Sequence, residues 1–217
     1  MKREIRKNFA MAASTLAAFV LWTAAVRFVD VAPIGPEGSA VGFATANGYF
    51  HRLTGVHMDL YILTDWLSLI PLGFIPGFAL LGLVQWICRR DIRKVDFSIF
   101  VLGGFYVLVM GAFLLFELFP VNYRPVLIEG VPEASYPSST TLLVMCVMPT
   151  AALQLRSRVR HPALRKCICV FIAGFSLFMV AGRLISGVHW LTDIIGGGLL
   201  SGGLVLLYRA VCGLEKG

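Results

Sequence analysis

Six long apolar stretches follow one another along the chain, separated by shorter segments that carry most of the charged residues. The stretches run from Phe9 to Val29, Leu60 to Ile87, Phe97 to Phe119, Ser139 to Leu155, Lys166 to Leu184 and Trp190 to Val211. A bilayer core about 30 Å thick requires roughly 20 apolar residues for each helical crossing. The pattern therefore predicts an all-α, polytopic membrane protein with six transmembrane helices. Pro71 and Pro76 lie inside the second stretch and are expected to kink it.

Composition indicates one membrane-embedded domain over residues 1–217. Of the 217 residues, 58% are hydrophobic and 14% are charged, and the mean hydropathy is +0.80. A chain of this composition cannot bury its apolar surface away from water by folding alone. Six crossings and their connections use the whole length, so neither a separate soluble domain nor nucleic-acid binding is expected.

The beginning of the chain has features of a secretory signal, because Lys2, Arg3, Arg6 and Lys7 precede the first apolar stretch. The apolar region of a cleaved signal is about 7 to 15 residues long. The stretch here is longer, which favours a retained first helix.

The distribution of basic residues predicts the orientation in the membrane. If the N-terminus is cytoplasmic, that side holds all of the 19 Lys and Arg residues except Arg27, Arg52, Arg124 and Arg183. Cytoplasmic loops are enriched in Lys and Arg, so both termini are predicted to be cytoplasmic. The long connection from Asp30 to Asp59 is then outside and is expected to lie along the membrane surface. A bacterial plasma membrane is the expected location.

Three polar clusters stand at the ends of predicted helices, and the orientation places all three outside. They are Asn122-Tyr123-Arg124-Pro125, Tyr136-Pro137-Ser138-Ser139-Thr140-Thr141, and the segment from Gly182 and Arg183 through His189 to Asp193. Ionisable groups cost about 2.5 to 3.5 kcal/mol each near the bilayer centre, so they are usually functional. Each side chain alone is compatible with an interface anchor or a packing residue. Their joint placement on one side predicts one site.

The residue types in these clusters suit phosphate chemistry. His189 and Asp193 are four residues apart, which on a helix lets the carboxylate accept a hydrogen bond from imidazole Nδ1 and leaves Nε2 free. Arg124 and Arg183 supply fixed charge and forked donors for phosphate oxygens. Ser138 and Ser139 offer hydroxyl groups and backbone N–H groups at the start of a helix. The sequence predicts phosphoryl transfer.

At these residues the sequence resembles the type 2 phosphatidic acid phosphatase family, the membrane relatives of vanadium haloperoxidases. The family signatures are K-x6-R-P, P-S-G-H and S-R-x5-H-x3-D. Arg183, His189 and Asp193 reproduce the spacing of the third signature, and Arg124-Pro125 and Pro137-Ser138 match parts of the other two. The resemblance spans roughly residues 97 to 208 and implies the six-helix phosphatase-like bundle of the family.

The resemblance also implies roles for the site residues. His189 is expected to be the nucleophile that forms a phosphohistidine, and Asp193 its orienting partner. The residues expected to bind the substrate phosphate are Arg124, Ser138, Ser139, Thr140 and Arg183. No metal and no cofactor are implied, because cationic side chains stabilise the charge.

Four positions depart from the family pattern. Glu117 stands in place of the first-signature Lys, Gly182 in place of Ser, Ser139 in place of Gly, and Thr140 in place of the second-signature His. In the family that His is thought to protonate the leaving oxygen, and a positioned general acid contributes about 10² to 10⁴ in rate. Thr140 cannot act as this acid. The substitutes that the outer loops offer are His51, His57, Glu129 and Glu133.

These observations favour a phosphoric ester or diphosphate hydrolase that acts on a phosphorylated lipid at the outer leaflet. Undecaprenyl diphosphate is the preferred substrate, because a phosphate leaving group has the least need of an acid. Phosphatidic acid or phosphatidylglycerol phosphate is the second choice. A catalytically impaired relative that binds lipid phosphates is the main alternative, and a small anion transporter is a further one. Besides the substrate, membrane lipids are the expected partners, and the oligomeric state stays open.

Overall fold

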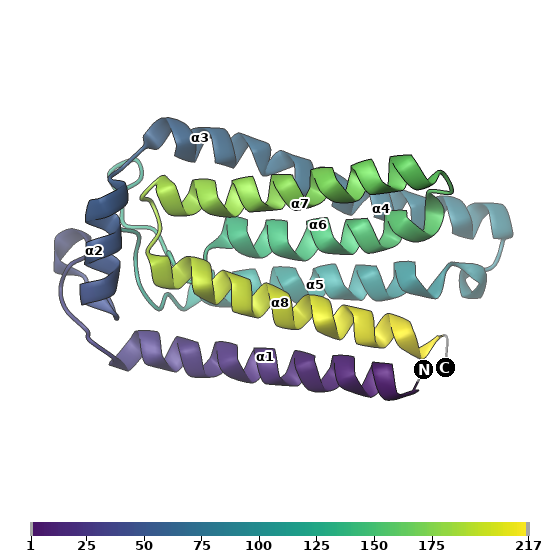
Figure 1. The fold of residues 1–217 in the computed structure, drawn as a ribbon, viewed down its shortest axis with the longest axis horizontal. Helices are drawn as coiled ribbons and strands as arrows, with labels where there is room; N and C mark the ends of the chain where they lie inside the picture. The colour runs from purple at the N-terminus through teal and green to yellow at the C-terminus, as the bar shows by residue number, and fades with distance from the viewer. Residues whose placement is uncertain (1, 216–217) are drawn as a thin grey trace.

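The computed structural model describes residues 2–215, and it is built from helices that run the length of one bundle (Figure 1). Met1, Lys216 and Gly217 lie outside the described residues, as does the side chain of Lys2. Two of the basic residues used to predict the orientation, Lys2 and Lys216, are therefore outside the described part. The helices are α1 (Lys2–Phe28), α2 (Ala44–Thr54), α3 (Met58–Leu67), α4 (Leu69–Arg89), α5 (Phe97–Leu118), α6 (Ser139–Arg158), α7 (Pro162–Ile185) and α8 (Leu191–Leu214). Two 3₁₀ turns, Pro36–Gly38 and Ile92–Lys94, lie in the connections.

The all-α architecture predicted from the apolar pattern is confirmed, and five of the six predicted crossings correspond to candidate membrane spans. Among the described residues, five segments are long and apolar enough to cross a membrane: α1, α3 with α4, α5, α7 and α8. The protein is therefore an integral membrane protein. α6 does not meet this criterion, and a sixth crossing stays a prediction.

α6 is less apolar than the five candidate spans, and it is the helix that other helices enclose. It packs against α4, α5, α7 and α8, and Val144, Cys146 and Met148 on it are fully buried. A helix enclosed by protein can carry polar groups that find partners there. Gln154 illustrates this, since its amide donates to the carbonyl oxygen of Ser98 at 3.0 Å and also to the hydroxyl of Tyr208.

The second apolar stretch forms two helices, with the break at Ser68 between α3 and α4. Pro71 lacks the N–H that would bond to the carbonyl of Leu67 in a continuous helix, and the Ser68 hydroxyl donates to the Asp65 carbonyl at 2.6 Å. The predicted kink is thus an interruption three residues before Pro71, whereas Pro76 lies inside α4.

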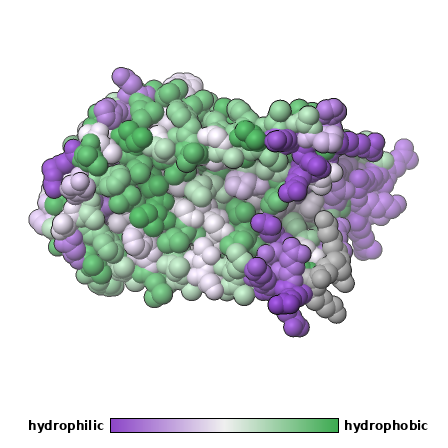
Figure 2. Space-filling model, in the orientation of Figure 1, coloured by the Kyte–Doolittle hydropathy of each residue, from purple (hydrophilic) through white to green (hydrophobic). Residues whose placement is uncertain are grey.

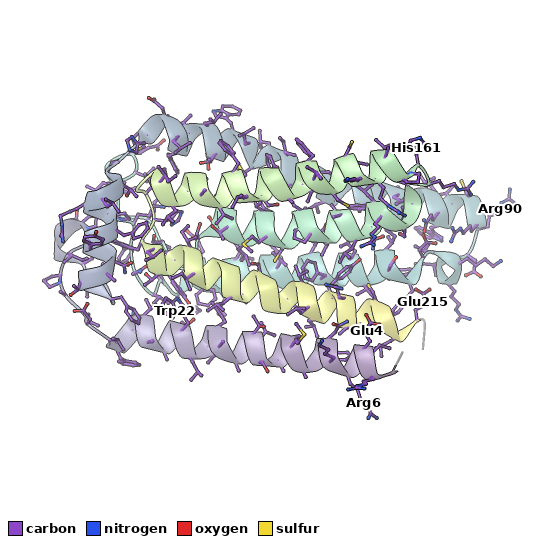
Figure 3. All side chains as sticks on the ribbon, viewed as in Figure 1. Glu4, Arg6, Trp22, Arg90, His161 and Glu215 are labelled. Atoms are coloured by element: carbon purple, nitrogen blue, oxygen red, sulfur yellow. The ribbon has the colours of Figure 1, made fainter. Side chains whose placement is uncertain are left out.

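The two ends of the bundle differ in polarity. Hydrophilic residues gather at the end where α1 begins and α8 finishes, and most of the visible remainder is apolar (Figure 2). Arg6, Arg90 and His161 lie at this end (Figure 3). This is the end that the basic residues predict to be cytoplasmic, and the sidedness stays a prediction.

At the opposite end, α2 crosses over the ends of the long helices (Figure 1). The buried side chain of Asn47 ties this helix to the start of α8: its amide nitrogen donates to Thr192 Oγ1 at 3.0 Å and its oxygen accepts from the Thr192 N–H at 3.2 Å. The link from α2 to α3 then covers the loop between α7 and α8. This loop carries His189.

Candidate active site

The loop between α7 and α8 is held in place by close backbone contacts. Gly187 has a φ of +69°, and a Cβ atom there would lie 1.9 Å from the Gly55 carbonyl oxygen. The backbone N–H of His57 donates to the carbonyl of Ser186 at 2.9 Å. Only glycine meets both demands at position 187, because it tolerates positive φ and has no side chain to clash.

His189 lies in this loop and not on a helix, because α8 begins at Leu191. The predicted arrangement of His189 and Asp193 on one helical face is therefore wrong in detail. Nδ1 of His189 is 3.7 Å from Asp193 Oδ2, which is too long for a hydrogen bond. The two side chains are nevertheless close, and both are buried.

Ser135 bridges the two residues. Its hydroxyl is 2.5 Å from Asp193 Oδ2 and 3.1 Å from His189 Nδ1. A hydroxyl has one proton, and a carboxylate can only accept, so Ser135 donates to Asp193 and accepts from the Nδ1–H of His189. The bridge selects the imidazole tautomer that leaves the lone pair on Nε2. Ser135 is 2% exposed, and its role was not predicted from the sequence.

Asp193 has no solvent exposure, and its two oxygens have three donors. Asn122 Nδ2 donates to Oδ1 at 3.1 Å, and the backbone N–H of Trp190 donates to Oδ2 at 2.8 Å, in addition to the Ser135 bond. These bonds fix the carboxylate in a buried position and connect the loop after α5 to the start of α8.

His189 is neutral at physiological pH. The pKa of His189 is lowered to about 4, chiefly by burial; Asp193 opposes this shift, and the nearby Arg124 and Arg183 charges add to it. A neutral imidazole with Nδ1 protonated presents its lone pair at Nε2. That atom is buried and has no hydrogen-bond partner among the residues that the structure describes.

Two arginines face the same space. Arg183 is 1% exposed, and its Nη2 donates to Asp65 Oδ1 at 2.7 Å. Arg124 Nε is 3.2 Å from Glu133 Oε2, and this contact is an ion pair without a hydrogen bond at Nε. Nε and Nη1 of Arg183 and Nη1 of Arg124 are likewise buried without a partner within residues 2–215.

Tyr61 lies between the two guanidinium groups. Its ring centroid is 4.7 Å from Cζ of Arg183 and 5.6 Å from Cζ of Arg124, distances at which the π face of the ring stabilises a cation. Tyr61 and Asp65 are one turn apart on α3. Neither residue was predicted from the sequence, although Asp65 inside an apolar stretch was a signal of function.

The residues at the start of α6 have different environments. Ser138 Oγ accepts from Thr141 Oγ1 at 3.1 Å and, at 3.4 Å, from the Thr141 N–H, so its hydroxyl caps the helix. The Ser138 N–H donates to the carbonyl of Asp193 at 3.1 Å. Ser139 and Thr140 border cavities. The phosphate-binding roles predicted for Ser138, Ser139 and Thr140 stay predictions.

Two cavities adjoin the site and share Ser139. One of ≈ 280 Å³ is bordered by Glu117, Arg124, Glu133 and Ser135 together with apolar residues. The other, of ≈ 240 Å³, is bordered by Asp65 and Thr140, and by side chains of α4, α5 and α6 such as Leu72, Met110 and Leu143. The second cavity thus joins a polar end to an apolar wall.

The glycine at position 182 also has a local explanation. A Cβ atom at Gly182 would lie 2.8 Å from Cγ2 of Thr64 on α3. The serine that the family signature has at this position would collide with that methyl group. The close approach of α3 to α7 brings Tyr61 and Asp65 to Arg183.

Comparisons with known proteins agree with this geometry. The fold is similar to the crystal structure of a transmembrane PAP2-type phosphatidylglycerolphosphate phosphatase from Bacillus subtilis, with a TM-score of 0.62 and 19% sequence identity over 95% of this chain and 96% of that one. A search of curated protein sequences finds no match. Residues 119–213, which include His189, Asp193 and both arginines, match the PAP2 superfamily. The part of the chain that carries these residues, 119–213, belongs to the PAP2 superfamily.

Proposed function

We propose that this protein is a lipid phosphatase that transfers a phosphoryl group to His189 and then to water. One observation carries the proposal: Nε2 of His189, Nη1 of Arg124, and Nε and Nη1 of Arg183 are buried without hydrogen-bond partners among the described residues. An unpaired buried polar group costs about 1 to 3 kcal/mol. A phosphate group would accept hydrogen bonds from the arginine donors and place its phosphorus in front of the Nε2 lone pair.

In the proposed reaction, the Nε2 lone pair of His189 attacks phosphorus and the bond to the leaving oxygen breaks. Ser135 and Asp193 hold the imidazole by Nδ1 and stabilise the positive charge that it acquires. Arg124 and Arg183 bind the equatorial phosphate oxygens, where their charge offsets the charge of the transition state. Water then attacks the phosphohistidine, which releases phosphate and restores the neutral imidazole.

A lipid is the proposed substrate class because the site lies at one end of apolar helices. The cavity that begins at Asp65 and Thr140 continues along Leu72 and Ile75 of α4 and Met110 of α5, a surface suited to an acyl or prenyl chain. The similar Bacillus subtilis protein is described as a phosphatidylglycerolphosphate phosphatase, which supports a lipid phosphomonoester. Undecaprenyl diphosphate is the substrate proposed if no residue replaces the acid missing at Thr140.

Lipid-phosphate binding without turnover is the second candidate function. Thr140 in place of the family acid favours it, and the two arginines suit binding as well as catalysis. However, binding alone does not require the hydrogen-bonded bridge from His189 through Ser135 to Asp193.

The distinguishing experiment measures phosphate release by the purified protein from a panel of lipid phosphates and diphosphates in detergent micelles. His189→Ala is the control. Release by the wild type and none by the variant supports the phosphatase. Retention of a lipid phosphate by both proteins, without release by either, would instead support the binding function.

A further inference from the structure

Asp65 is a carboxylate at the site that no family signature includes. Its Oδ1 accepts from Arg183 Nη2 at 2.7 Å, while its side chain is 61% exposed. Oδ2 has no hydrogen bond to any residue in the described part of the chain. One oxygen is therefore held by the arginine, and the other can carry a proton without loss of that contact.

The position of Asp65 relative to Thr140 indicates which side of the phosphate it faces. Both residues border the cavity of ≈ 240 Å³, and Thr140 occupies the place where the family has the acid for the leaving oxygen. In phosphoryl transfer the attacking and leaving atoms are roughly in line on opposite sides of phosphorus. With the leaving group placed in this cavity, Asp65 lies on its side of phosphorus, and Nε2 of His189 attacks from the opposite side.

The other carboxylate that pairs with an arginine has a different position. Glu133 is within 3.2 Å of Arg124, but it borders the neighbouring cavity, whose lining does not include Thr140. Glu133 therefore resembles Asp65 in its charge and in its ion pair with an arginine. It differs because it does not border the cavity that contains Thr140. This makes Glu133 the matched control.

We propose that Asp65 is the general acid that replaces the missing histidine, an inference that rests on the proposed phosphatase activity. As His189 Nε2 forms the bond to phosphorus, the P–O bond to the lipid breaks, and the leaving oxygen takes the proton of Asp65 Oδ2. The free alcohol departs and Asp65 becomes a carboxylate. In the second step that carboxylate takes a proton from the attacking water, the P–N bond breaks, and phosphate leaves with both residues restored.

The Asp65 acid form makes alkyl phosphomonoesters accessible substrates, so the site is not restricted to diphosphates.

The test compares leaving groups. Wild type and Asp65→Asn are assayed for kcat/KM on phosphatidic acid, whose alkoxide must be protonated, and on 4-nitrophenyl phosphate, whose phenolate leaves with little help. Asparagine can still accept from Arg183, so the arginine stays in place. We expect Asp65→Asn to lose about 10²- to 10⁴-fold on phosphatidic acid, the range of a general acid, and to change far less on the aryl ester. Thr140→His added to Asp65→Asn should restore the alkyl activity selectively.

Glu133→Gln should lower both activities by the same factor, since it affects only the pairing of Arg124. An equal loss on the two substrates for Asp65→Asn would show that Asp65 only positions Arg183, and would overturn the proposal. The wild-type reaction tests the underlying function separately. If the wild type hydrolyses neither substrate while binding phosphatidic acid, the proposed phosphatase activity fails, and the acid role of Asp65 fails with it.

Discussion

Ser135 stands between His189 and Asp193, with its hydroxyl 3.1 Å from the imidazole Nδ1 and 2.5 Å from the carboxylate Oδ2. The histidine and the aspartate are themselves 3.7 Å apart. The orienting effect of Asp193 on the imidazole therefore passes mainly through a serine from a different part of the chain. Ser135, in the segment before α6, is a positioning residue for His189.

Ser135→Ala should lower kcat, and its effect on KM should be smaller. Without the hydroxyl, Nδ1 of His189 loses its acceptor, and hydrogen bonds to charged groups contribute about 1.5 to 3 kcal/mol. That corresponds to roughly a 10- to 100-fold loss in rate. Steady-state kinetics on one lipid phosphate provides the measurement. Ser201→Ala is a suitable control, because Ser201 is also fully buried but bonds to the Gly197 carbonyl within α8. Similar losses in both variants would argue against the bridge.

Mild acid should destabilise the fold, because His189 takes up a proton when the protein unfolds. Burial lowers the pKa of His189 from 6.5 to about 4, so between these values the unfolded chain binds a proton that the folded protein does not. The contribution to stability is complete above pH 6.5 and is lost as the pH falls toward 4. The unfolding temperature in detergent, measured from pH 7 to pH 5, should fall more steeply for wild type than for His189→Asn. Parallel curves would contradict a buried neutral histidine.

Restoration of the family serine at position 182 should destabilise this chain. Gly182→Ser places a side chain 2.8 Å from Cγ2 of Thr64, and overpacking of this kind costs about 1 to 3 kcal/mol. Thr64→Ser removes the methyl group and should recover most of the loss. Thermal unfolding of the two single variants and the double variant gives the coupling. Additive effects would mean that the two positions do not compete for space.

The long helices could be predicted because each crossing requires a long apolar stretch, which is visible in the sequence. The short α2 has no such stretch, whereas α6 was predicted from the apolar stretch Ser139 to Leu155. At the site, His189 and Arg183 belong to one motif with fixed spacing. Ser135 and Asp65 do not, since Asp65 is 118 residues away from its partner Arg183. Only the packing of α3 on α7 brings that pair together.

Topology can be tested by cysteine labelling in a cysteine-free background. Val131 is exposed in the loop before α6, and Arg160 is exposed between α6 and α7. Because basic residues mark the cytoplasmic side, an impermeant thiol reagent should label Val131→Cys in intact cells and Arg160→Cys only after permeabilisation. The reverse pattern would place the site on the cytoplasmic side.

The covalent intermediate is the central claim of the proposed function, and it can be trapped. The purified protein is mixed with a radiolabelled lipid phosphate, quenched in alkali within one turnover, and the phosphorylated residue is mapped by mass spectrometry. We predict phosphate on His189 in wild type, and none in His189→Ala, which also releases no free phosphate. Phosphate on another residue, or undiminished phosphate release by His189→Ala, would contradict the assignment of His189 as the nucleophile.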